Sequence, residues 1–249
     1  MMEFFVPSAL SVLDVAILTV VRFAGSFITM ALGIGGGALL LAVMASIMPA
    51  AALIPVHGVI QLGSNAFRSV TLMSYVSWKP VGWFVFGTVI GVAIGGMIAI
   101  QLPAAIVQIC VGVFVIWNVL SQPPKWLSTA PTIIGVISSF LTMFFGATGT
   151  FVANFTKSLT LPRHQHVATH GMLMSAQHFF KVAAFTVLGF SFSGWVGFLA
   201  LMIIAGFVGT LVGKLVLNKM TDRGFKRALD IVLILISIRL IVSGGLALM

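Results

Sequence analysis

The chain has 249 residues, of which 60% are hydrophobic and only 7% are charged, and its mean hydropathy is +1.20. These values exclude an ordinary soluble domain and predict a polytopic membrane protein. The formal charge of +9 does not indicate a nucleic-acid partner, because the basic residues are scattered among apolar segments and short loops, where membrane orientation explains them better. The single cysteine, Cys110, excludes an intramolecular disulfide.

Apolar segments recur along the whole chain, and several approach the length of about 20 residues that a helix needs to cross a bilayer. They cover residues 12–32, 52–76, 81–100, 104–120, 132–145, 167–189, 195–216 and 231–248. The stretch before the first segment lacks a basic region and carries Glu3, and Asp14 lies inside that segment, so we expect the segment to be retained as a span rather than cleaved as a signal. The predicted fold is all-α, in contact with the lipid bilayer.

A polar stripe interrupts the second apolar segment, where residues 57–69 read HGVIQLGSNAFRS. At 3.6 residues per turn the polar side chains fall on one face of a helix. They are His57, Gln61, Ser64, Asn65 and Arg68. A polar face on an otherwise apolar helix indicates a binding role or a buried partner.

The sequence indicates an internal duplication, because a shift of 113 residues without gaps superposes glycines, prolines, histidines and basic residues of the two halves. The shift sets Gly33 on Gly146, Gly36 on Gly149, Pro49 on Pro162, His57 on His170, Gly58 on Gly171 and Arg68 on Lys181. The second stripe reads HGMLMSAQHFFKV, and its polar residues are His170, Gln177, His178 and Lys181. We predict a first transmembrane repeat over residues 1–121, a linker over 122–128 and a second repeat over 129–249.

Each repeat contains a short apolar segment after its glycine cluster, at residues 38–48 and 151–161. Counting both as membrane segments gives five per repeat, and an odd number inverts the second repeat. The basic loop residues then lie on one face, as expected of a cytoplasmic face. They are Lys79, Lys125, Arg163, Lys214, Lys219, Arg223, Lys226 and Arg227. The alternative, re-entrant short segments in parallel repeats, would place Lys79 and Lys125 opposite the others.

The glycine clusters GIGGG and GATGT predict broken helices. A helix that begins at such a break offers amide groups and a positive dipole end to an anion. The candidate donors are Gly35, Gly36, Gly37, Gly149 and Thr150, and Asn154 could add a side-chain donor in the second repeat. Close packing of helices through small residues is the alternative for each cluster.

Arg68 and Lys181 are the candidate anion ligands, since a cation within a span needs a cavity or a partner. The acidic residues Glu3, Asp14, Asp222 and Asp230 all lie near predicted span ends. Snorkelling of the long side chains toward the interface is the alternative. For the other two cations within spans, Arg22 and Arg239, packing or snorkelling is the preferred interpretation.

The histidines allow more than one interpretation. His57 and His170 could exchange protons near neutral pH, as proton coupling requires, or could cap helices. His164, His166 and His170 resemble a metal site only weakly, because no carboxylate or cysteine accompanies them. We therefore expect no metal and no other cofactor.

These motifs resemble the sulfite exporter TauE/SafE family of anion permeases. The resemblance is carried by GIGGGALLL with Pro49, by GATGTFVANF with Pro162, and by HGMLMSAQHFFKVAAFTVLGF. It implies a bacterial or archaeal inner-membrane transporter of sulfite, sulfonates or small organic anions, with proton or ion coupling. The glycine motifs and the helices after the two prolines would form its site.

Four functions are weighed against these residues. A secondary transporter, whose two halves rock about the site, accounts for the paired cations and broken helices. An anion channel on the same scaffold is the main alternative. A membrane enzyme is disfavoured because no nucleophile and base motif is present. A scaffold for partner proteins would not need Arg68 or Lys181. The substrate, the direction of transport, the coupling ion and the oligomeric state stay open.

Overall fold

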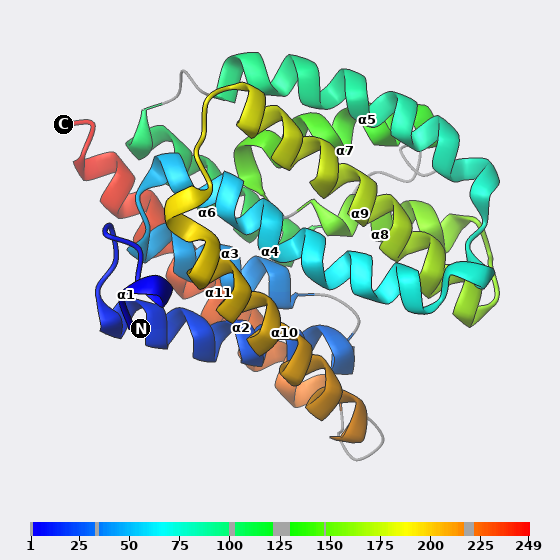
Figure 1. The fold of residues 1–249 in the computed structure, drawn as a ribbon, viewed down its shortest axis with the longest axis horizontal. Helices are drawn as coiled ribbons and strands as arrows, with labels where there is room; N and C mark the ends of the chain where they lie inside the picture. Colours follow the sequence, from blue (N-terminus) through cyan, green and yellow to red (C-terminus); the bar gives the residue numbers. More distant parts are fainter. Residues whose placement is uncertain (1, 33–34, 100–102, 122–129, 147, 217–221) are drawn as a thin grey trace. The chain divides into compact units, whose positions relative to one another are not determined.

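The computed structural model describes residues 2–32, 35–99, 103–121, 130–146, 148–216 and 222–249 (Figure 1). Within these ranges all regular structure is helical and no strand is present, so the predicted all-α fold is confirmed. The α-helices are α1 (Met2–Phe5), α2 (Val12–Leu32), α3 (Gly36–Ile47), α4 (Ala50–Thr71), α5 (Trp78–Ala99), α6 (Ala104–Leu120), α7 (Pro131–Phe145), α8 (Gly149–Ser158), α9 (Arg163–Val187), α10 (Val196–Val216) and α11 (Asp222–Leu246). Two 3₁₀ turns, η1 (Met73–Tyr75) and η3 (Ser193–Trp195), precede α5 and α10.

Four described segments are long and apolar enough to cross a membrane, judged by length and composition. They are Val12–Met30, Ala50–Thr71, Trp78–Ile98 and Ser193–Gly213. The helices after the glycine clusters are much shorter, with 12 residues in α3 and 10 in α8. At 1.5 Å per residue they extend about 18 and 15 Å, against about 30 Å of hydrocarbon. Each therefore has the length of a half-helix.

The start of α2 explains the acidic residue at the edge of its apolar segment. The Ser11 hydroxyl accepts a hydrogen bond from the Asp14 amide at 3.1 Å, and the Asp14 carboxylate accepts one from the Ser11 amide at 2.9 Å. This reciprocal pair is a capping box, which satisfies two backbone donors that a helix start leaves open.

The helices form two compact units. The first unit comprises Met1–Val56, Pro103–Leu120 and Ser191–Met249, and the second comprises His57–Leu102 and Ser121–Phe190. Each unit draws helices from both predicted repeats, so the repeats are not the compact bodies. The predicted linker at 122–128 lies outside the described residues.

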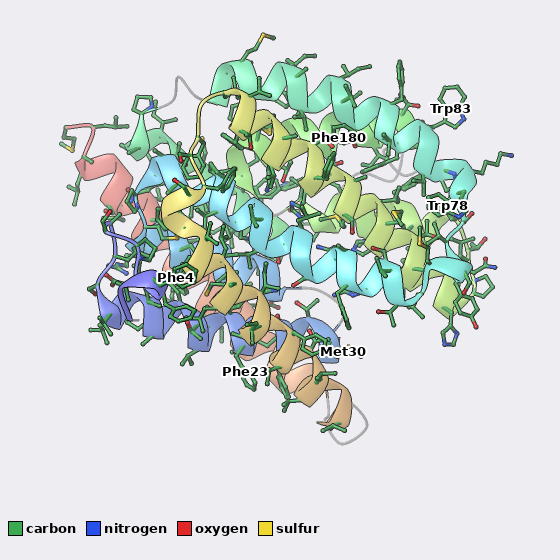
Figure 2. All side chains as sticks on the ribbon, in the orientation of Figure 1. Phe4, Phe23, Met30, Trp78, Trp83 and Phe180 are labelled. Atoms are coloured by element: carbon green, nitrogen blue, oxygen red, sulfur yellow. The ribbon has the colours of Figure 1, made fainter. Side chains whose placement is uncertain are left out.

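In the first unit, α2 packs along α10 through glycines of α10. Gly209 lies against the backbone carbonyl of Phe23, and Gly213 lies against Phe27 and Met30, so that Phe23 and Met30 follow α10 in Figure 2. Arg22 is buried here. Its Nε donates to the carbonyl of Met202 at 3.2 Å, which confirms a packing role. Arg239, on α11, is exposed.

In the second unit, α5 packs against α7 through a glycine at every fourth residue, and α9 contacts both helices (Figure 1). Gly87, Gly91 and Gly95 lie against the carbonyls of Thr132, Val136 and Phe140 in turn. Small residues with this spacing let two helix backbones approach closely in a membrane. The opposite face of α5 is apolar and exposed, and Figure 2 shows Trp83 projecting from it.

Candidate functional site

The second unit contains basic residues and no carboxylate. Its two sequence ranges, 57–102 and 121–190, include no Asp or Glu, whereas all four acidic residues of the chain belong to the first unit. The basic residues of the second unit are Arg68, Lys79, Lys125, Lys157, Arg163 and Lys181. Within this unit, no cation can therefore be neutralised by a side chain.

Among those of these cations whose side chains the structure describes, Lys181 is the most deeply buried. Its side chain, on α9, has 0% relative exposure, and its ammonium lies 3.5 Å from the hydroxyl of Thr142 on α7. The aliphatic stem rests on Gly58 of α4, where a Cβ would come within 2.8 Å of the Lys181 Cε. An ammonium has three donors, and a single contact at 3.5 Å is a weak hydrogen bond. Among the described residues the charge has no other polar partner.

The Lys181 charge lies beside the break between α7 and α8. Helix α7 ends at Gly146, whose φ of 71° belongs to the left-handed region that favours glycine. The Thr142 hydroxyl that accepts from Lys181 also donates to the carbonyl of Gly146 at 3.3 Å. Helix α8 begins at Gly149, and the side chain of its N-cap residue, Thr148, makes no capping hydrogen bond. The start of α8 therefore lies three residues along the chain from the Gly146 carbonyl that the Thr142 hydroxyl contacts.

Gln177, one turn before Lys181, links α9 to both sides of this break. Its amide nitrogen donates to the Thr148 hydroxyl at 2.6 Å, and its amide oxygen accepts from the Ser138 hydroxyl at 3.2 Å. All three side chains are fully buried. Helical periodicity predicted Gln177, whereas Ser138, Thr142 and Thr148 were not predicted. Ser138 and Thr142 stand four residues apart, which places two hydroxyls on one face of an apolar helix, and that spacing was the available signal.

His178 and His57 complete the polar cluster. Their rings are 6.5 Å apart, nearly perpendicular, and buried to 1% and 0% exposure. Neither ring nitrogen of His178 has a hydrogen-bond partner among the described residues. His178 and Lys181 are three residues apart on α9, so they share a helix face.

Other residues of α4 and α9 near the predicted stripes lie where these two helices pack together. The Ser69 and Ser175 hydroxyls lie 3.1 Å apart, and Gly171 packs on Asn65 and Ser69. Since Gly58 meets Lys181 near the other end, the two helices run antiparallel. Gln61, Ser64 and Arg68 are half-buried, and Asn65 is buried but donates its amide to the Gln61 carbonyl at 2.8 Å.

The remaining predicted residues of the second unit lie on α8 and early in α9. Thr150 and Asn154 occupy successive turns of α8 and are half-buried. The His170 ring lies 3.5 Å from the Thr156 hydroxyl and stacks on His166, whereas His164 contacts Tyr75. Within the described ranges no three histidine, cysteine or acidic side chains are grouped to hold a metal ion.

The first glycine cluster belongs to the other unit. Gly35 has a φ of 103° and precedes α3, while Gly36 lies directly against the Gly25 backbone of α2. Gly37 follows in the first turn of α3, and Gly33 lies outside the described residues. Gly36 therefore packs closely against α2, as the alternative interpretation of a glycine cluster predicts. Gly149 differs, since a Cβ there would meet only the Met174 Cε at 3.6 Å.

Comparison with known proteins bears on the chain as a whole. The family model described as sulfite exporter TauE/SafE matches residues 17–240, which is most of the sequence. Searches of curated proteins and of solved structures found no significant match. With its apolar helices and this match, the protein is membrane-embedded and is a member of the sulfite exporter TauE/SafE family.

Proposed function

We propose that the chain is a permease for a small oxyanion, with sulfite as the leading substrate, and that the anion binds beside Lys181 in the second unit. The observation that carries the proposal is a fully buried ammonium in a unit without any carboxylate. A buried charge without a partner costs several kcal/mol, about the amount measured when one member of a buried ion pair is removed. An anion that enters from solution would supply the missing charge.

The groups around Lys181 suit an anion with several oxygens. Two of the three ammonium donors have no partner in the described part of the chain, and α8 begins three residues after Gly146, whose carbonyl the Thr142 hydroxyl contacts. A helix start contributes roughly half a positive elementary charge to an anion beside it. The Thr148 hydroxyl and the Gln177 amide add donors that can be shared with a ligand. Sulfonates and small carboxylates present the same acceptors, so they are the competing substrates.

The helix order supports the proposal of two repeats, and five segments in each, an odd number, would invert the second repeat. A shift of 113 residues brings α2, α3, α4, α5 and α6 close to α7, α8, α9, α10 and α11 in turn. The packed pairs α2 with α10 and α5 with α7 exchange under this shift. Five segments per repeat would set the basic loops on the cytoplasmic face of a cell inner membrane.

Alternating access requires a joint between the moving parts. The boundary between the two units falls within α4, after Val56, and Pro55 lies one residue earlier inside that helix. Proline removes one backbone hydrogen bond and clashes with the preceding turn, which weakens the helix at that point. We propose that motion of one unit relative to the other bends α4 here. The function is then transport, not enzymatic conversion of the anion.

The experiment is uptake of labelled sulfite by proteoliposomes that contain the purified protein. The proposal predicts saturable uptake that sulfonates or short carboxylates inhibit, that Lys181→Gln abolishes, and that Lys157→Gln on the exposed end of α8 leaves intact. Flux that does not saturate would indicate a channel. Sulfite uptake equal to that of empty vesicles would contradict a sulfite permease.

A further inference from the structure

His178 is a buried titratable residue that has no role in the proposed binding of the anion by Lys181. Its ring is 1% exposed and neither nitrogen has a hydrogen-bond partner among the described residues. A neutral imidazole has one donor and one acceptor, and burying either without a partner destabilises the folded state. Native proteins rarely keep such a group unless it serves a function or binds something else.

Few titratable groups face this ring. Lys181 on the same helix and His57 on α4 interact with it electrostatically. Helix α7 contains no titratable residue, Lys157 of α8 is exposed, and Lys79 stands in the first turn of α5. Tyr75 of η1 contacts His164, near the far end of α9. Arg68 is eleven residues beyond His57 on α4, or about 16 Å along the helix.

We propose that His178 binds the proton that accompanies the anion, so that one proton crosses with each anion in the same direction. This inference rests on the proposed function and names its coupling ion. In the empty site the Lys181 ammonium opposes a second positive charge on the ring, since like charges close together disfavour each other. An anion beside Lys181 offsets that repulsion, and the imidazolium can then donate a hydrogen bond to the anion.

Proton and anion therefore strengthen each other's binding, because coupling between two sites is reciprocal. The proton comes from water on the side where the anion enters. The proton returns to water on the other side. There the anion leaves, and the Lys181 charge again disfavours a positive charge on His178. His57 does not need to change its charge in this scheme.

The test compares sulfite counterflow with proton flux in the same proteoliposomes, using an enclosed pH dye. Sulfite itself exchanges protons near neutral pH, so the comparison is between variants under identical conditions. We expect His178→Gln to retain counterflow within about threefold and to lose at least about nine-tenths of the protein-dependent proton flux, because glutamine keeps a donor but cannot carry a proton. The control is His164→Gln, whose ring is exposed and remote from the cluster.

Two results would overturn the inference while leaving the permease intact. One is a proton flux in His178→Gln that equals that of the wild type. The other is a loss of proton flux in His57→Gln while His178→Gln retains it. Absence of sulfite counterflow in the wild type would instead contradict the proposed function, and this inference with it.

A second measurement applies if His178→Gln does not fold. The wild-type chain has five histidines, and ¹⁵N NMR of histidine-labelled protein in detergent distinguishes imidazole from imidazolium. At a fixed pH, sulfite is expected to convert one ring to imidazolium. No conversion at saturating sulfite would overturn the proposal.

Discussion

The ammonium of Lys181 lies 3.5 Å from the Thr142 hydroxyl, four residues before the glycine that ends α7. This contact brings a buried charge on one helix to the break in another. The same hydroxyl donates to the carbonyl of Gly146, so the break and the charge share one polar group. The site is therefore built by packing between α7 and α9 and not by either helix alone.

Gly58 sets the position of the Lys181 side chain. In Gly58→Ala the new methyl group would come within 2.8 Å of the Lys181 Cε, so the flexible stem must move. We expect sulfite affinity to fall about tenfold, equivalent to about 1.4 kcal/mol, with little change in thermal stability. The matched control is Gly171→Ala, where a Cβ meets its nearest atoms at 3.5 Å and affinity should hold. Equal effects of the two variants would contradict this role of Gly58.

The two glycine clusters should respond differently to alanine. Gly36→Ala forces a methyl group into the Gly25 backbone, and overpacking of this kind costs about 1 to 3 kcal/mol or more. Gly149→Ala meets only a methionine methyl at 3.6 Å, so the fold should tolerate it. Melting temperatures in detergent measure both effects. If Gly149 lets an anion approach the start of α8, sulfite affinity should still fall in its variant.

Gln177 should be structurally important because it holds two buried hydroxyls. Gln177→Leu removes the partner of Thr148 and of Ser138, and each unpaired buried group costs about 1 to 3 kcal/mol. A clear loss of thermal stability is expected. Gln108→Leu on α6 is the comparison, since that side chain is half-buried and reaches the Ala45 carbonyl only at 3.4 Å. A larger loss in Gln108→Leu would argue against the network at the break.

Pro55 is predicted to affect movement and not binding. In Pro55→Ala the α4 helix regains its backbone hydrogen bond and stiffens at the boundary between the units. We expect the maximal rate of sulfite transport to fall severalfold while the affinity measured at equilibrium stays the same. Pro80→Ala, in the first turn of α5 where proline is tolerated, should leave the rate unchanged. Unaltered transport in Pro55→Ala would contradict the proposed bending of α4.

Apolar length located most of the helices. The predicted segments at 12–32 and 104–120 coincide with α2 and α6. The segment at 167–189 missed the first turn of α9, which begins at Arg163, because that turn is polar and hydropathy does not detect it. The short helices α3 and α8 begin two residues before the predicted positions, since the glycines themselves adopt helical geometry.

The polar cluster around Lys181 was only partly predictable. Helical periodicity predicted that Gln177, His178 and Lys181 share a face of one helix, because a polar face within an apolar segment is visible along a single helix. It could not identify Thr142 or Thr148, since a threonine in a membrane helix commonly bonds its own backbone and becomes a ligand only through tertiary packing. The difference between Gly36 and Gly149 is likewise a property of their neighbours.

Thermal stabilisation of the purified protein by sulfite in detergent tests directly whether the anion binds at Lys181, because a ligand that binds the folded state raises its apparent stability. We expect stabilisation of the wild type and of Lys157→Gln. We expect none in a folded Lys181→Gln variant, since a hydrogen bond to a charged group contributes about 1.5 to 3 kcal/mol and its loss weakens affinity by about ten- to a hundredfold or more. Equal stabilisation of Lys181→Gln and the wild type would contradict the claim that the buried ammonium binds the anion.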